Sequence, residues 1–501
     1  MDIEHAARYA ALQARDPRFD GRFYVGVTST GIYCRPVCRV RMPRAANCRF
    51  FVSAAAAETA GFRPCLRCRP ELAPGRSSLD MPSRLAWAAA QRIEAGEADA
   101  AGLSALAGRL GITDRHLRRL FADTFGVSPV AYAQTHRLLH AKRLLADTAL
   151  PVTQVALAAG FRSLRRFNEL FRGRYGLSPT ALRRRGGEVR GAFPGDGLAF
   201  EMAWRPPYDW ERFIAFLAAR CIPGVEAVFD LRYRRSVGLD GTTGWLELSR
   251  FPGRDAVTVR VSPGLLPVLP AVLARVGRLC DLACDPHAVA SVLGPLAAEA
   301  PGMRVPGAFD GFEMAVRAIL GQQVTVRAAH TLAGRVVAAL GTPLETPFAG
   351  IDRVFPDPPT ISRVAPAELA ALGIVRARAE AIVALARAVE NQCLDLAPAG
   401  DPVEMATRLQ ALPGIGRWTA QYIALRALAW PDAWPTGDVA LAKALGVVRA
   451  RDADAMAEVW RPWRGYAALH LWRRLAEGGA PPASDAGAIT KTQRTYRGEG
   501  P

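Results

Sequence analysis

Apolar residues recur at helical spacing in two long parts of the chain, and strand-like segments lie between these parts. The first helical part runs from about 83 to 183. The second begins at Phe309 and continues the 3.6-residue period through Phe312, Val316, Ile319, Leu320, Ile382, Leu385 and Val389. Between them, apolar and polar residues alternate over Leu198–Met202, Trp245–Leu248 and Val257–Val261, which predicts β-strands.

The first helical part contains an internal repeat. Leu106-Ala107, Leu110-Gly111-Ile112 and Gly126-Val127-Ser128-Pro129 recur as Val155-Ala156, Ala159-Gly160-Phe161 and Gly176-Leu177-Ser178-Pro179. In each copy a short apolar helix meets a glycine turn and a second helix follows, as in a helix-turn-helix unit whose second helix enters the DNA major groove.

The expected recognition segments are 114–119 and 163–168. Leu117, Leu120 and Phe121 should face the core, and the outward candidates for DNA contact are Arg115, His116, Arg118, Arg119, Arg165 and Arg166. An alternative is a pair of arginine-rich helices that only face solvent.

The length of 501 residues favours three or four domains. The fold class we expect is multi-domain and mainly α with α+β parts. Loop-forming residues at 74–78 and 183–188 predict two linkers. The expected domains are 1–75 (a small α/β unit), 83–183 (paired helix-turn-helix), 198–305 (α/β), 306–482 (all-α) and a disordered tail at 483–501.

The charge balance indicates a polyanionic partner. The chain has 64 Lys and Arg against 46 Asp and Glu, a formal charge of +18, and almost all of the cations are arginine. Phosphate neutralisation supplies most non-specific affinity for DNA, so double-stranded DNA is the expected partner. The alternative is an arginine bias in composition without any partner. The polar N-terminus and the absence of a long apolar run predict no membrane segment and a cytoplasmic protein.

Five of the nine cysteines lie early in the chain, at Cys34, Cys38, Cys48, Cys65 and Cys68. Cys34-Arg-Pro-Val-Cys38 and Cys65-Leu-Arg-Cys68 provide two thiolate pairs on short loops, a pattern typical of one tetrahedral zinc ion. Disulfide bonding or inert buried thiols are the alternatives. Cys48 falls outside the pattern, and we expect it to pack in the core.

The segments TGIYCRPVCR (Thr30–Arg39) and GFRPCLRC (Gly61–Cys68) resemble the N-terminal domain of the Ada methylation-response proteins, and the two helix-turn-helix units resemble the AraC-type domain that follows it in that family. The resemblance implies that Cys34 is both a zinc ligand and the acceptor of a methyl group from a DNA methylphosphotriester. Methylation of one of four zinc-bound thiolates removes negative charge and repulsion from DNA, which would activate transcription through contact with RNA polymerase. The alternative is a purely structural zinc site. No Pro-Cys-His-Arg motif occurs, so the alkylguanine transferase half of Ada is missing.

The segment LPGIGRWTA (Leu412–Ala420) predicts a helix-hairpin-helix motif, in which Gly414, Gly416 and Arg417 place backbone N–H groups against a DNA phosphate. Asp438 follows in Pro435-Thr436-Gly437-Asp438-Val439. With WRPPYDW (Trp204–Trp210), RAILGQ (Arg317–Gln322) and WRPW (Trp460–Trp463), the region resembles the AlkA-type 3-methyladenine DNA glycosylases.

That resemblance assigns Asp438 as the catalytic carboxylate, which stabilises the sugar cation and orients water as the base leaves. Trp418, Tyr422 and Trp472 match the positions of an aromatic pocket for a cationic base, and Trp418 replaces the lysine of glycosylases with lyase activity, so hydrolysis alone is expected. Gln323 stands where AlkA has an apolar wedge. Asp438 could instead only cap a helix, and Trp472 could be an ordinary core residue.

The sequence therefore predicts an enzyme for DNA alkylation repair fused to a methylation-dependent transcriptional activator. It is expected to bind damaged and promoter DNA, one zinc ion and a monovalent cation at the hairpin. A non-catalytic transcription factor, or a glycosylase with an inert zinc site, remains the alternative.

Overall fold

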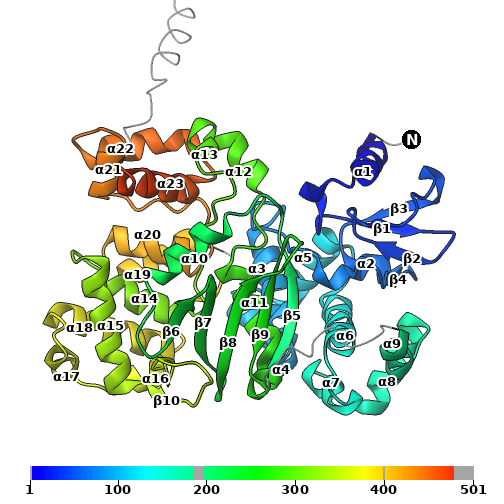
Figure 1. The fold of residues 1–501 in the computed structure, drawn as a ribbon, viewed down its shortest axis with the longest axis horizontal. Helices are drawn as coiled ribbons and strands as arrows, with labels where there is room; N and C mark the ends of the chain where they lie inside the picture. The colour runs from blue at the N-terminus through cyan, green and yellow to red at the C-terminus, as the bar shows by residue number, and fades with distance from the viewer. Residues whose placement is uncertain (1–2, 186–196, 399–400, 479–501) are drawn as a thin grey trace, which may run out of the picture.

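The computed structural model describes residues 3–185, 197–398 and 401–478 (Figure 1). The chain is mainly helical, with a sheet in the N-terminal domain and a larger one at the centre. Part of the second expected linker and the expected tail lie outside the described residues. None of the described helices combines the length and the apolar character that spanning a bilayer requires.

The N-terminal domain consists of a sheet covered by helices. Its elements are α1 (Ile3–Ala14), β1 (Tyr24–Val27), β2 (Ile32–Cys34), β3 (Cys48–Phe51), α2 (Ala54–Thr59) and β4 (Arg63–Pro64). The strand order is β3-β1-β2-β4. Only β2 and β4 pair in parallel, with Tyr33 opposite Pro64. This register brings the residues that follow Tyr33 and Pro64, both cysteines, to the same edge of the sheet.

The helical repeat forms two helix-turn-helix units joined by one long helix. The elements are α3 (Arg84–Glu94), α4 (Glu97–Arg109), α5 (Asp114–Phe125), α6 (Pro129–Asp147), α7 (Val152–Ala158), α8 (Leu164–Tyr175) and α9 (Pro179–Arg185). Helix α4 is interrupted at Gly102, whose φ is +82°. The turns before α5 and α8 contain Gly111 and Gly160 with φ of +70° and +78°, values that favour glycine.

Local capping explains why the repeat is visible in the sequence. Both α5 and α8 end at a left-handed glycine, Gly126 or Gly176. The serine two residues later caps the next helix: Ser128 Oγ accepts from Ala131 N, and Ser178 Oγ from Ala181 N. A proline at the first helical position follows each serine. The predicted core residues Leu117 and Phe121 are buried.

The two segments expected to be linkers are ordered more tightly than their composition suggests. Residues 74–78 form neither helix nor strand, but Pro74 and Ser78 are buried, and the indole N–H of Trp87 donates to the Arg76 carbonyl at 3.0 Å. In the second segment, residues 183–185 are the last of α9, and the Arg183 guanidinium donates to the Leu150 carbonyl at 2.5 Å. Tertiary hydrogen bonds therefore hold the described residues of both segments, and the domain boundaries that they were expected to mark stay a prediction.

The central domain is an antiparallel sheet of order β5-β9-β8-β7-β6. Its elements are β5 (Leu198–Ala203), α10 (Trp210–Ala218), β6 (Glu226–Phe229), β7 (Arg232–Leu239), β8 (Thr242–Arg250), β9 (Ala256–Val261), α11 (Leu269–Leu279), α12 (Pro286–Leu293) and α13 (Pro295–Ala298). The three predicted strands lie within β5, β8 and β9. One apolar core contains sheet residues such as Tyr233 and Leu246 together with Phe167 and Phe171 of α8, so the second helix-turn-helix unit packs on this domain.

The C-terminal domain is helical, apart from the short pair β10 (Thr342–Pro343) and β11 (Arg353–Val354). Its helices are α14 (Gly311–Leu320), α15 (Val326–Leu340), α16 (Pro358–Ser362), α17 (Pro366–Ala371), α18 (Arg376–Glu390), α19 (Pro402–Gln410), α20 (Arg417–Arg426), α21 (Val439–Ala444), α22 (Ala450–Met456) and α23 (Arg464–Ala476). In Figure 1 the domain occupies the side of the sheet opposite the N-terminal domain. The predicted helical core residues Val316, Ile319 and Ile382 are buried.

Candidate metal centre and glycosylase site

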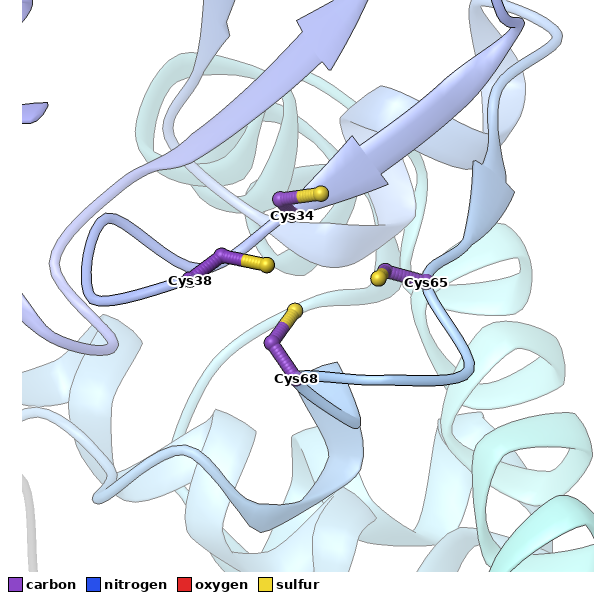
Figure 2. Close-up of side chains that lie close together, drawn as sticks. All are labelled: Cys34, Cys38, Cys65 and Cys68. Atoms are coloured by element: carbon purple, nitrogen blue, oxygen red, sulfur yellow. The ribbon is translucent and has the colours of Figure 1, made fainter. Parts of the chain in front are cut away.

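Four cysteines meet at one edge of the N-terminal sheet. Cys34 ends β2 and Cys65 follows β4, and the parallel pairing of these strands sets them side by side. Cys38 and Cys68 lie on the turns that follow, closed by bonds from Cys38 N to Arg35 O and from Arg69 N to Cys65 O. The four sulfur atoms point toward one another and lie within 4.8 Å of each other (Figure 2).

This arrangement fits zinc. A tetrahedral ion with Zn–S bonds of ~2.3 Å needs sulfurs ~3.8 Å apart. The observed cluster is close to that spacing, and it consists only of thiols, which are soft ligands that zinc accepts in a closed structural site. The chain therefore has a four-cysteine zinc site, as predicted. Cys48 is buried outside the cluster in a separate apolar core, which confirms its packing role.

Backbone N–H groups treat the four sulfurs unequally. The amide of Arg35 donates to Cys68 Sγ at 3.4 Å. Within the described residues, no backbone amide forms such a bond with the sulfur of Cys34, Cys38 or Cys65. An N–H donor draws electron density from a thiolate, so Cys68 has the most stabilised sulfur of the set.

The arginines around the cluster have two different roles. Arg39, Arg41, Arg44, Arg63 and Arg67 are exposed and available to a phosphate backbone. Arg35 is only 9% exposed and is ion-paired with Asp20, while its Nη1 donates to the Cys68 carbonyl at 3.2 Å. Arg69 pairs with Asp147 of α6 at 2.7 Å. The ion pairs of these last two arginines hold the zinc loop in place.

The zinc domain is fixed to α6 by buried charges. Lys142 and Glu71, with side chains 2% and 3% exposed, pair at 2.6 Å. Glu58 accepts hydrogen bonds from Tyr33 at 3.0 Å and Thr135 at 3.3 Å. Burial raises the pKa of Glu58 to about 7 and outweighs the opposing effect of Arg174 at 3.7 Å. The zinc domain and α6, the helix that joins the two helix-turn-helix units, thus form one packed unit.

Both recognition helices present their polar face to solvent. Arg115, Arg118 and Arg119 of α5 are exposed and His116 is partly exposed. Arg165 and Arg166 of α8 are also exposed, and Arg165 pairs only with Glu169 on its own helix. The cationic side chains that the sequence assigned to DNA contact are therefore accessible, and their contacts with DNA stay a prediction.

The hairpin between α19 and α20 has the expected geometry. Gly414 has φ of +75°, and a Cβ there would lie 2.9 Å from Ala381 Cβ, so glycine is needed for both backbone and packing. Gly416 begins α20, and a Cβ there would meet no atom within 4 Å. Arg417 is exposed. The open backbone at Gly416 is thus free to approach a phosphate, while the monovalent cation stays a prediction.

Asp438 is the N-cap of α21, and each of its carboxylate oxygens has one donor. Oδ1 accepts from Leu441 N at 2.8 Å, and Oδ2 accepts from the indole Nε1 of Trp418 at 2.7 Å. The carboxylate is partly exposed and, in the described part of the chain, forms no ion pair. A carboxylate oxygen has two acceptor positions, so each oxygen of Asp438 keeps one free. Asp438 therefore caps a helix and still has a carboxylate with free acceptor positions.

The predicted aromatic residues gather beside this carboxylate. Trp418 and Tyr422 stack with ring centroids 5.1 Å apart and an interplanar angle of 10°. Trp472 meets Tyr422 edge to face at 6.2 Å. All three side chains are only partly buried. The group provides the electron-rich faces that a cationic base would contact, next to a hydrogen-bonded carboxylate.

Arg426, which the sequence interpretation missed, lies behind the aromatic group. Its Nη1 donates to the Tyr422 hydroxyl at 2.7 Å, and its side chain is 6% exposed. Although burial alone would raise the pKa of the Tyr422 phenol, the guanidinium groups of Arg426, Arg220 and Arg317 bring it below its ordinary value. Arg426 lies four residues after Tyr422 on the same helix, a spacing that could have signalled the contact.

Gln323 lies at an exposed bend between α14 and α15, with φ of +51°. Its neighbour Gln322 fixes this bend to the hairpin, because Gln322 Nε2 donates to Gly414 O at 2.8 Å and to Thr419 Oγ1 at 3.0 Å. The bend and the hairpin therefore form one surface, and Gln323 projects from it. This position suits a wedge, whose role stays a prediction.

A cavity of about 350 Å³ lies elsewhere, between the N-terminal and C-terminal halves, and neither Asp438 nor the aromatic group lines it. The two candidate sites lie at other places. The first is a thiol cluster beside DNA-binding helices, and the second is a carboxylate beside stacked aromatic rings and a helix-hairpin-helix.

Comparisons with known proteins agree with this division. Four family models match: the metal binding domain of Ada at residues 7–71, a helix-turn-helix domain at 106–185, the AlkA N-terminal domain at 199–310 and the HhH-GPD superfamily base excision DNA repair protein at 316–464. A probable bifunctional transcriptional activator/DNA repair enzyme AlkA of Mycobacterium tuberculosis is 40% identical over 480 residues, which cover 93% of this chain and 96% of that protein.

Two Escherichia coli proteins each match one half. DNA-3-methyladenine glycosylase 2 is 39% identical over 282 residues, 56% of this chain and 99% of that protein. The bifunctional transcriptional activator/DNA repair enzyme Ada is 38% identical over 155 residues, 31% of this chain and 42% of that protein. The partial cover of Ada agrees with the absence of its transferase motif from this sequence.

Fold and sites together define a helix-hairpin-helix DNA glycosylase joined to a zinc-containing, DNA-binding regulatory half. The predicted combination is confirmed at the level of domains and family. The chain belongs to the family of bifunctional transcriptional activator/DNA repair enzymes of the AlkA kind, in which an Ada metal-binding domain precedes a glycosylase of the DNA-3-methyladenine glycosylase II type.

Proposed function

We propose that the C-terminal half hydrolyses the N-glycosidic bond of alkylated bases of the 3-methyladenine type, with Asp438 as the catalytic carboxylate. Cleavage moves the bond electrons onto the base and leaves positive charge on the sugar. Asp438 faces that charge and accepts a proton from the attacking water. Trp418, Tyr422 and Trp472 hold the cationic base, and Gln323 fills the space that the extruded nucleotide leaves.

The observation that carries this proposal is the pair of hydrogen bonds to Asp438. Leu441 N and Trp418 Nε1 each donate to one oxygen and fix the plane of the carboxylate next to the aromatic group. Because no cation pairs with it within the described residues, its negative charge stays available for the sugar. Trp418 provides no amine for a Schiff base, so the product is an abasic site without strand cleavage.

The test is release of 3-methyladenine from methylated DNA. Asp438→Asn keeps the size of the side chain and removes its charge, and we expect release to fall by a factor of at least ~100, the order that a lost electrostatic contact costs. Asp357→Asn is the matched control, because Asp357 caps α16 through Thr360 N without any role in the site. Release at the wild-type rate by Asp438→Asn would exclude Asp438 as the catalytic carboxylate, and no release by the wild type would support the non-catalytic transcription factor instead.

We further propose that Cys34 accepts a methyl group from a DNA methylphosphotriester. In this step an S–CH₃ bond forms, the O–CH₃ bond breaks and the phosphate leaves as a diester anion. Zinc, when bound, keeps the thiols deprotonated at neutral pH. Cys34 lacks the backbone donor that Cys68 receives from Arg35, which favours Cys34 over Cys68. Its choice over Cys38 and Cys65 depends on the resemblance to the Ada domain. The transfer removes one negative charge from a cluster that exposed arginines bring close to phosphate, so affinity for promoter DNA should rise.

Mass spectrometry of the protein after incubation with DNA that contains methylphosphotriesters tests this proposal. We expect one added methyl group, located on Cys34, and none in a Cys34→Ser variant. A methyl group on Cys38, Cys65 or Cys68 would assign the nucleophile differently, and no methyl group would leave the cluster as a structural zinc site.

The two helix-turn-helix units are proposed to bind promoter DNA through Arg115, Arg118, Arg119, Arg165 and Arg166. Recruitment of RNA polymerase would follow once the methylated form is bound. Four zinc-binding thiols require a reducing compartment, which favours action in the cytoplasm.

A further inference from the structure

The regulatory half (residues 3–185) and the glycosylase half (residues 197–478) meet at a buried arginine, Arg205. Arg205 follows β5 in the glycosylase half and is 1% exposed. Its Nη1 donates to Ala283 O of the same half at 2.6 Å. Its Nη2 donates to two carbonyls of the other half, Asp20 O at 2.7 Å and Gly75 O at 2.9 Å. Most of the acceptors of this guanidinium are therefore supplied by the zinc domain and the segment after it.

Other polar contacts cross the same boundary, with their donors in the regulatory half. Arg22 of the zinc domain pairs with Asp285 at 3.0 Å, and Arg143 of α6 donates to Glu201 O at 2.6 Å. Farther along, Arg92 of α3 is 5% exposed and pairs with Asp395 at 2.5 Å. Each of these arginines belongs to the regulatory half, and each partner belongs to the glycosylase half.

Apolar packing accompanies the polar contacts. The core of the second helix-turn-helix unit is continuous with the core of the central sheet. Ala429 of the C-terminal domain packs against the core of the first unit, which includes Trp87 of α3. The boundary also encloses the cavity of about 350 Å³, lined by groups from both halves such as Arg76 and Arg278. The boundary thus combines polar contacts, apolar contacts and an internal cavity.

Separation of the halves would be costly at Arg205. A buried guanidinium that loses its acceptors must either be hydrated or stay unpaired, and removal of one partner from a buried charged contact is strongly destabilising. The Nε of Arg205 already lacks a partner, so the two carbonyls of the other half carry much of its hydrogen bonding.

We propose that the regulatory half, residues 3–185, is a specific docking partner of the glycosylase half, residues 197–478, and that the two hold together without the peptide link between them. Arg205 is the central positioning residue of this surface. The glycosylase half and the zinc domain then form one packed unit. Asp20 connects them, because its carboxylate binds Arg35 of the zinc loop and its backbone carbonyl binds Arg205.

The test uses the full chain with a protease recognition site inserted between Arg185 and Gly197. After cleavage of the folded protein, we expect both pieces to elute together in gel filtration, with a Kd below ~1 µM, as for a specific interface of standard size. Elution as two separate pieces at micromolar concentration would overturn the proposal.

Single substitutions at the contact between the two halves test which residues hold them together. Arg205→Gln should weaken association ~10- to 100-fold, as loss of a buried charged donor does. Asp395→Lys places a cation opposite Arg92 at a side chain that is 41% exposed, so folding is preserved and association should also weaken. Arg376→Gln is the control, because that side chain is 85% exposed and pairs only within α18. Association of both interface variants equal to that of the control would refute the assignment, and Asp395→Lys decides the matter if Arg205→Gln does not fold.

Discussion

The hydrogen bond between Trp418 and Asp438 gives a sharp test of how the carboxylate is held. Trp418→Phe keeps an aromatic ring to stack on Tyr422, whose ring lies 5.1 Å away and nearly parallel, but removes the N–H that donates to Asp438 Oδ2 at 2.7 Å. The substitution therefore separates the binding role of this residue from its role in orientation. We expect kcat to fall and KM for damaged DNA to change little.

The size of the expected decrease in kcat follows from the kind of hydrogen bond that is lost. A hydrogen bond to a charged acceptor contributes about 1.5–3 kcal/mol. If all of it serves to hold the carboxylate toward the sugar, its loss slows base release by a factor of roughly 10 to 150. The remaining bond from Leu441 N to Oδ1 keeps part of the orientation, so the lower end of this range is expected.

Single-turnover release of 3-methyladenine at saturating enzyme measures this directly. Trp434→Phe is a matched control, since the indole of Trp434 also donates to a carboxylate, Asp454 Oδ1, at 2.8 Å in the same domain. That variant should lose stability and keep its rate. A Trp418→Phe enzyme that is as fast as wild type, or faster, would refute the reasoning, because the bond would then restrain the carboxylate rather than orient it.

Two further predictions concern the regulatory half. Between pH about 4.5 and 7, Glu58 keeps its proton in the folded protein and loses it in the unfolded chain. The wild type should therefore lose up to about 3 kcal/mol of its free energy of unfolding as the pH rises through this window. Glu58→Gln should abolish that part of the pH dependence. Differential scanning calorimetry of both proteins from pH 4.5 to 8 tests this, and parallel pH profiles would contradict it. Cys48→Ser should retain one zinc per chain by atomic absorption, whereas Cys65→Ser should lose it; zinc loss in Cys48→Ser would place Cys48 in the site.

The elements that the sequence predicted well are those with local signals. The helix-turn-helix repeat depends on a left-handed glycine followed by a capping serine, and both act within a few residues of the chain. The zinc cysteines were found because their spacing is a property of short loops. The hairpin was found for the same reason, since Gly414 must accept a positive φ.

Long-range contacts gave no such signal. The segment from Pro74 to Ser78 has the composition of a linker, but its conformation depends on Trp87 and on Arg205, which lies far along the chain. Arg35 and Arg69 look like DNA contacts among the other arginines of the zinc domain. Only the fold shows that Asp20 and Asp147 neutralise them, because a carboxylate partner at long sequence separation leaves no pattern in the chain.

Asp438 caps α21 and is also the proposed catalytic carboxylate, so one side chain has a structural role and a proposed chemical role. A cap needs only one oxygen, and Leu441 N takes Oδ1. The second oxygen is therefore not required for the helix, yet an indole N–H is directed at it, in a wall of aromatic rings that is only partly buried. That second donor stabilises the fold, as a hydrogen bond to a charged group does. Under the proposed function, the same bond also fixes the direction of the carboxylate, which matters for a charge that must face a developing cation.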